Sequence, residues 1–135
     1  MPGVVRIALL GSVATAKPRP KDIDLLVAVT DDMDLTALAT AGRRLKGHAQ
    51  QANLGADVFL ADPAGRYLGR TCRWTRCIPG LRMRCEALTC GRRQYLYDDL
   101  KVLRLARATI TAPPIELHPR IVTRVPVPAD VIKFL

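Results

Sequence analysis

The stretch Asp22 to Val29, with the sequence Asp-Ile-Asp-Leu-Leu-Val-Ala-Val, limits the folds open to this chain more than any other feature. It is rich in Val, Ile and Leu, as a central β-strand requires. Because side chains alternate along a strand, Asp22 and Asp24 point to one face and Ile23 points to the other. Carboxylates are costly to bury, so the aspartate face must be open to water or matched by positive charge.

Two further apolar runs, residues 4–10 and residues 56–61, predict additional buried strands. A helix is expected over residues 35–52, because apolar or small residues recur there at three- and four-residue steps. These residues are Leu35, Leu38, Gly42, Leu45, Ala49 and Ala52. A short helical turn is expected at residues 13–16, before two prolines end it. A strand, a helix and a second strand in this order predict a right-handed crossover that places the two strands close together.

The second half of the chain predicts shorter elements. Residues 67–105 hold short apolar pieces, for which we expect antiparallel strands and a helix near residues 95–103. From Ala112 the chain is rich in proline, and we expect an extended tail that packs against the body. The predicted class is α/β (α+β), a small mixed sheet with helices on one side. Residues 1–65 would form the core and residues 66–135 a basic, cysteine-containing, strand-rich extension of the same single domain.

Charge is distributed unevenly along the chain, whose net charge is +9. Residues 1–65 contain seven Lys/Arg and seven Asp/Glu, whereas residues 66–135 contain fourteen Lys/Arg and five Asp/Glu. This asymmetry indicates an anionic partner, which could be a nucleic acid, a nucleotide or an acidic protein, or else only a solvated basic surface. If a partner is bound, we expect Arg82, Arg84, Arg92 and Arg93 to hold the acceptor, because they cluster around the segment Cys85–Cys90.

The aspartates predict a metal-assisted phosphate chemistry. Asp22 and Asp24 would lie about 7 Å apart on one strand face, where they could bind Mg²⁺ together with phosphate oxygens. Two such ions, about 4 Å apart, could activate an attacking oxygen and stabilise the leaving pyrophosphate. Asp57 lies in the third predicted strand and could serve as a third metal ligand or take a proton from the acceptor. The glycine of Gly11-Ser12 would let the backbone approach a phosphate, and the serine hydroxyl could donate to it.

These residues also resemble a known family. The segments Leu9-Leu10-Gly11-Ser12, Asp22-Ile23-Asp24-Leu25-Leu26-Val27 and Ala56-Asp57-Val58-Phe59-Leu60 are similar to those of the minimal nucleotidyltransferases of the DNA polymerase beta superfamily. The resemblance covers about residues 4–62. It implies the transfer of a nucleoside monophosphate from a nucleoside triphosphate, with two Mg²⁺ ions held by Asp22, Asp24 and Asp57. It also implies that Ser12 binds phosphate.

The resemblance suggests acceptors and partners as well. Family members modify proteins, RNA ends or small molecules, and in toxin–antitoxin pairs the acceptor is a tyrosine of the partner protein. We therefore expect transfer of AMP or another NMP to a hydroxyl, with a partner protein or a homo-oligomer as a further expectation. Many members carry arginines soon after Gly-Ser. Here Lys17, Arg19 or Lys21 would supply that charge, and Lys17 and Lys21 join Gly11 and Ser12 as nucleotide-binding candidates.

Four cysteines, Cys72, Cys77, Cys85 and Cys90, fall within nineteen residues. Four thiolates could form a tetrahedral Zn²⁺ site, although this spacing is looser than the two-residue gaps of zinc knuckles. Two disulfides or four small buried side chains would explain the same residues. The sequence leaves these three alternatives open.

Two other functions compete with the enzyme. A catalytically degenerate relative would keep the fold and bind nucleotide or nucleic acid without turnover, and a zinc-stabilised interaction protein would depend on the four cysteines. The presence of all three aspartates favours the enzyme. The longest apolar stretch is shorter than the roughly 20 residues of a membrane span, and the first residues lack the features of a signal peptide. We therefore expect a cytoplasmic protein with no membrane partner.

Overall fold

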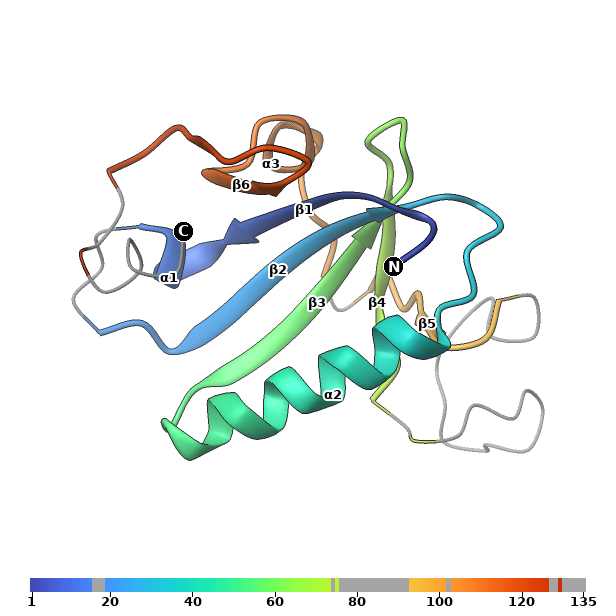
Figure 1. Ribbon diagram of the computed structural model, residues 1–135, viewed down its shortest axis with the longest axis horizontal. Helices are drawn as coiled ribbons and strands as arrows, with labels where there is room; N and C mark the ends of the chain where they lie inside the picture. The colour runs from blue at the N-terminus through green and yellow to red at the C-terminus, as the bar shows by residue number, and fades with distance from the viewer. Residues whose placement is uncertain (16–18, 74, 76–92, 102, 127–128, 130–135) are drawn as a thin grey trace.

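The described part of the chain folds around a mixed sheet of seven strands (Figure 1). The computed structural model describes residues 1–15, 19–73, 75, 93–101, 103–126 and 129. The strand order is β5-β4-β3-β2-β1-β6-β7, so strands from both halves of the chain join the same sheet. The strands are β1 (Val4–Leu10), β2 (Asp22–Val29), β3 (Gly55–Ala61), β4 (Tyr67–Thr71), β5 (Leu96–Tyr97), β6 (Ile115–His118) and β7 (Val122–Thr123).

The central three strands form as the sequence predicts. Strand β1 runs antiparallel to β2, with the four-residue helix α1 (Gly11–Ala14) following β1. Helix α2 (Thr36–Gln51) connects β2 to β3, and these two strands are parallel neighbours. Asp34 lies just before α2, and its Oδ1 accepts hydrogen bonds from the backbone N and the hydroxyl of Thr36, the first helical residue, at 2.9 and 2.6 Å.

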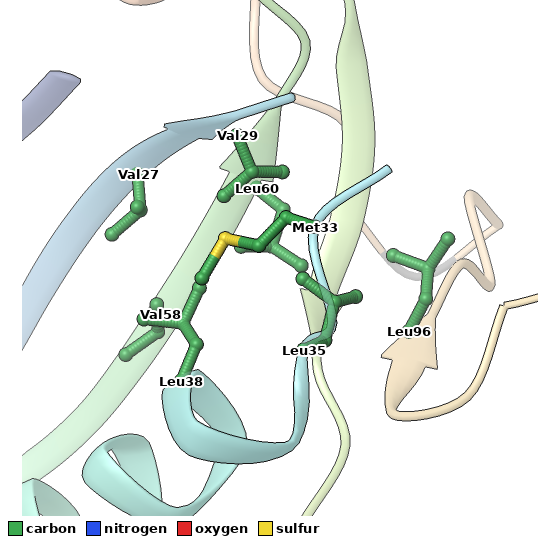
Figure 2. Close-up of a cluster of buried hydrophobic side chains, with 8 residues drawn as sticks. All are labelled: Val27, Val29, Met33, Leu35, Leu38, Val58, Leu60 and Leu96. Atoms are coloured by element: carbon green, nitrogen blue, oxygen red, sulfur yellow. The ribbon is translucent and has the colours of Figure 1, made fainter. Parts of the chain in front are cut away.

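Helix α2 covers one face of the sheet (Figure 1). The core on this side combines alternate residues of β2 and β3 with residues that enter and begin the helix (Figure 2). These are Val27, Val29, Met33, Leu35, Leu38, Val58 and Leu60, and Leu96 of β5 joins them. The alternation that was read from the sequence therefore determines which side chains of β2 meet the helix.

The opposite face carries a second core cluster. Ala8, Leu10, Leu26, Phe59 and Ala61 of the central strands pack there against Ile110 of helix α3 (Arg107–Thr111). The prediction of helices on one side only is therefore wrong. The physical reason is that, near the carboxyl ends of β2 and β3, the side chains on this second face are apolar as well. They must also be shielded from water, and α3 packs on them.

The second half differs from expectation in one further element. A helix was expected near residues 95–103, but Leu96–Tyr97 is strand β5, and residues 98–101 and 103 are not helical. Tyr95 has φ 66°, a left-handed conformation that does not continue into a right-handed helix. The expected short antiparallel strands are present as β4 and β5, and the proline-rich tail packs on β1 through β6. None of the helices that the structure describes has the length and apolar character that crossing a membrane demands.

Candidate functional site

Asp22, Asp24 and Asp57 lie on one face of the sheet. Asp24 and Asp57 are register partners across the parallel pair β2–β3, so their side chains leave the sheet on the same side. Leu26 and Phe59, the next partners on this face, belong to the cluster beneath α3. The carboxylates thus occupy the end of the face opposite α2, and the apolar residues under α3 occupy the other end. Their positions agree with the alternation in the sequence.

Asp24 is the centre of this group. It is half-buried, and burial together with the negative charges of Asp22 and Asp57 raises its pKa to about 6. A carboxyl group that is this reluctant to ionise marks a place where a bound cation would be stabilising. The three side chains are therefore electrostatically coupled in the folded chain.

Two glycines leave space for these carboxylates, one on each side of β2. Gly11 follows Leu10, the register partner of Asp24, and a Cβ on Gly11 would lie 2.5 Å from Asp24 Oδ2. Gly55 is the register partner of Asp22, and a Cβ there would collide with Asp22 Oδ1. Gly11 also has φ 69°, which L residues rarely adopt. The turn at Gly11-Ser12 is therefore directly beside Asp24, and its role in binding phosphate stays a prediction.

The remaining nucleotide-binding candidates are less informative. Ser12 is half-buried at the start of α1, and its carbonyl oxygen accepts a hydrogen bond from the Thr15 hydroxyl at 3.3 Å. Lys21 is exposed just before Asp22, and its carbonyl oxygen accepts a hydrogen bond from Gly55 N at 2.9 Å. Lys17 lies outside the described residues. The roles of Ser12, Lys17 and Lys21 in binding nucleotide stay predictions.

Asp57 has a basic neighbour that the sequence did not single out. Arg70 on β4 places Nη1 3.7 Å from Asp57 Oδ1, an ion pair that is longer than a hydrogen bond. The guanidinium carbon of Arg70 also lies 5.5 Å from the centre of the Tyr97 ring, within the range of a cation–π contact. Both contacts arise because Phe59, Arg70 and Tyr97 are successive register partners across three strands. No local signal in residues 67–71 marks Arg70, because only the strand pairing brings it to Asp57.

Arg93, one of the four acceptor-binding candidates, contacts the segment that follows β2. Its Nη2 donates to the carbonyl oxygens of Thr30 at 2.8 Å and Met33 at 3.4 Å, in the segment after the far end of β2. Arg93 therefore lies near the far end of β2, away from Asp22 and Asp24, and its role in holding the acceptor stays a prediction. The carbonyl oxygens of Thr30 and Met33, which follow the end of β2, need hydrogen-bond donors, and the Arg93 guanidinium supplies both hydrogen bonds. Arg82, Arg84 and Arg92 lie outside the described residues.

Of the four cysteines, only Cys72 belongs to the part of the chain that the structure describes. It is buried just after β4, and its backbone N donates to the carbonyl oxygen of Tyr95 at 2.8 Å. Cys77, Cys85 and Cys90 lie outside the described residues, so zinc, disulfides and a plain core all stay open.

The carboxylate group fits Mg²⁺ in its chemistry. Among the described residues, no three His, Cys, Asp or Glu side chains converge closely enough to form a complete metal site. Mg²⁺ is commonly bound by one or two carboxylates, with water and substrate phosphate oxygens filling the other positions. Asp22 and Asp24 offer such a partial set, and burial together with the charges of Asp22 and Asp57 raises the pKa of Asp24 to about 6.

Comparison of the chain with protein-family models, curated proteins and solved structures finds no match. The functional interpretation therefore depends on the geometry described above and on the resemblance of the motifs.

Proposed function

We propose that the chain is a metal-dependent nucleotidyltransferase that transfers a nucleoside monophosphate, AMP in the first instance, from a nucleoside triphosphate to a hydroxyl acceptor. One observation carries the proposal: Asp22, Asp24 and Asp57 share one end of a sheet face directly beside the Gly11-Ser12 turn. This juxtaposition supports the activity because carboxylates and a phosphate-binding turn are the two parts that the chemistry needs.

Each residue has a role in this proposal. Asp22 and Asp24 would hold the magnesium ions, which when bound offset negative charge on the phosphates and assist the attacking and leaving oxygens. Asp57 would accept the proton of the acceptor hydroxyl, with Arg70 orienting its carboxylate. Gly11 would let the triphosphate approach the backbone, and the Ser12 hydroxyl would donate one hydrogen bond to it.

The test is incubation of the purified chain with each labelled nucleoside triphosphate and Mg²⁺, with and without candidate acceptors. Transfer should depend on Mg²⁺, and Asp22→Asn and Asp24→Asn should each lower it by at least about a hundredfold, the usual effect of losing an electrostatic contact to the reacting phosphates. Both variants should keep the circular dichroism of the native chain, because the two carboxylates lie in the solvated part of the face.

Asp31→Asn is the matched control, since it removes the same charge at an exposed position in the connection between β2 and α2. It should transfer at the rate of the native chain. Full activity of Asp24→Asn, or activity that persists in excess chelator, would contradict the proposal.

A further inference from the structure

A small cavity lies next to the carboxylates, on the side of β3 that faces β4. Its volume is about 150 Å³. The pairing of β3 with β4 begins only at Phe59, so the first residues of β3, Asp57 among them, border this opening. The described residues that line it are Lys46, Asp57, Arg70, Thr71, Arg73 and Tyr97.

The lining is strongly basic. Among the described residues that line it, three side chains are cationic and one, Asp57, is a carboxylate. Arg70 is oriented by its ion pair with Asp57 and by its contact with the Tyr97 ring, yet 27 % of its side chain remains exposed to solvent. A guanidinium that is oriented and still accessible is well suited to bind the oxygens of a phosphate group.

The size of the cavity limits what it can take. Pockets for drug-sized ligands have volumes of about 300–1,000 Å³, so this cavity fits a single charged group and not a whole nucleotide. Its place in the sheet is equally informative. The Gly11-Ser12 turn follows β1 on one side of the carboxylates, and the cavity is next to β4 on the other. Three strand spacings of about 4.8 Å put the two sites about 14 Å apart.

We propose that this cavity binds a phosphate group of the acceptor, so that the acceptor is a phosphate-bearing hydroxyl compound. The inference rests on the proposed nucleotidyltransferase activity, in which the nucleoside triphosphate occupies the Gly11-Ser12 side. Asp57 forms part of the cavity wall, so a hydroxyl next to the bound phosphate lies within reach of the carboxylate that takes its proton. The phosphate can belong to the end of a nucleic-acid strand or to a sugar phosphate, since both present the same group beside a hydroxyl.

The test uses the double variant Lys46→Gln/Arg73→Gln, which leaves Asp57 and its partner Arg70 in place. The control is Arg44→Gln/Arg104→Gln, which removes the same charge at two exposed positions outside the cavity lining. Binding of a fluorescein-labelled single-stranded RNA 12-mer with a free 3′-hydroxyl is followed by anisotropy. Unlabelled ribose 5-phosphate, with ribose as its reference, competes for the site. Binding of ATP with Mg²⁺ is measured on the same proteins.

The cavity variant should bind the RNA or the sugar phosphate roughly tenfold more weakly than the native chain, and the control should change less than about twofold. The affinity for ATP should not change. In transfer assays, the KM for the acceptor should rise while kcat is kept. Competition by ribose 5-phosphate but not by ribose indicates a small phosphorylated acceptor, whereas binding of the RNA alone indicates a nucleic-acid end.

Two results overturn the inference while the proposed activity stands: acceptor affinity that is equal in the cavity variant and the control, or ATP affinity that falls as much as acceptor affinity. Conversely, if the native chain transfers no nucleotide but the cavity variant still loses phosphate binding, the proposed activity fails and the phosphate site stands.

Discussion

Gly11 joins two structural demands at one residue. Its φ of 69° is in the left-handed region, and the space that a Cβ would take is filled by Asp24 Oδ2. A side chain at this position therefore costs both backbone strain and displacement of the carboxylate. Gly47, in the exposed part of α2, is its opposite, because a Cβ there would meet nothing within 4 Å.

Gly11→Ala should destabilise the chain by about 1–2 kcal/mol from the left-handed backbone alone, and should weaken binding of Mg²⁺ and nucleoside triphosphate because Asp24 must move. Gly47→Ala, the matched control, should stabilise the chain by about 0.5–1 kcal/mol, since alanine loses less entropy in a helix. Urea unfolding followed by circular dichroism measures both changes. A neutral or stabilising Gly11→Ala would show that the close approach to Asp24 is unimportant.

Helix α3 and strand β6 are held to the rest of the chain by one polar cluster. Arg6 of β1 donates from Nη1 to the carbonyl oxygen of Ile110 at 2.6 Å, and it forms an ion pair with Glu116 of β6. Arg124 adds a second contact to Glu116, with Nη1 3.3 Å from Oε1. Burial acts to raise the pKa of Glu116, but the hydrogen bonds and charges of the two arginines outweigh it and lower the pKa.

A lowered pKa means that Glu116 contributes stability above its ordinary pKa of 4.5, and that this contribution is lost as the pH falls through the folded-state value. Glu116→Gln should therefore lower the free energy of unfolding by about 1–2 kcal/mol at pH 7. The gap to the native chain should shrink as the pH falls from 5 to 4. Urea titrations at several pH values measure this difference in the free energy of unfolding. Asp32→Asn, at an exposed site, is the control. A gap that is the same at pH 4 and pH 7 would exclude a charge-dependent contact.

At the scale of the whole molecule, the two faces of the sheet have different tasks. One face is covered by α2 over an apolar core (Figure 1). The other is divided between the apolar residues under α3 and the carboxylates of β2 and β3. The fold thus holds negative charges together at Asp22, Asp24 and Asp57, against their mutual repulsion. Stability and the proposed function therefore oppose each other at this end of the sheet.

This opposition predicts a pH-dependent effect of Mg²⁺. Because the pKa of Asp24 is raised to about 6, stability that is complete below its ordinary pKa of 3.8 is lost as the pH rises through about 6. Solvent screening limits the loss to about 1 kcal/mol. MgCl₂ should restore it at pH 8 and raise Tm, but have little effect at pH 5, where protons compete for Asp24.

Asp24→Asn should show neither the loss nor the Mg²⁺ effect, and NaCl at equal ionic strength controls for screening. Thermal unfolding gives Tm for the native chain with MgCl₂, for the native chain with NaCl and for Asp24→Asn. A rise in Tm with MgCl₂ that is equal at pH 5 and pH 8, or equal in Asp24→Asn, would place the metal elsewhere on the chain.

The sequence by itself determined the elements of the first half and the direction of their side chains. Apolar runs and alternation in residues 22–29 and 56–61 depend on local chemistry, and a helix between two strands constrains how they pair. The common face of Asp22 and Asp24 follows from this alone, and the nearness of Asp57 follows from the crossover.

Only the tertiary structure decided what surrounds the carboxylates. Arg70 and Tyr97 reach Asp57 through strand register, Arg93 is drawn away by backbone carbonyls, and α3 covers the face that was expected to have no helix. These contacts join residues far apart in the chain. Their pairing depends on which strands become neighbours and where each strand ends, and the pattern within any one segment does not contain that information.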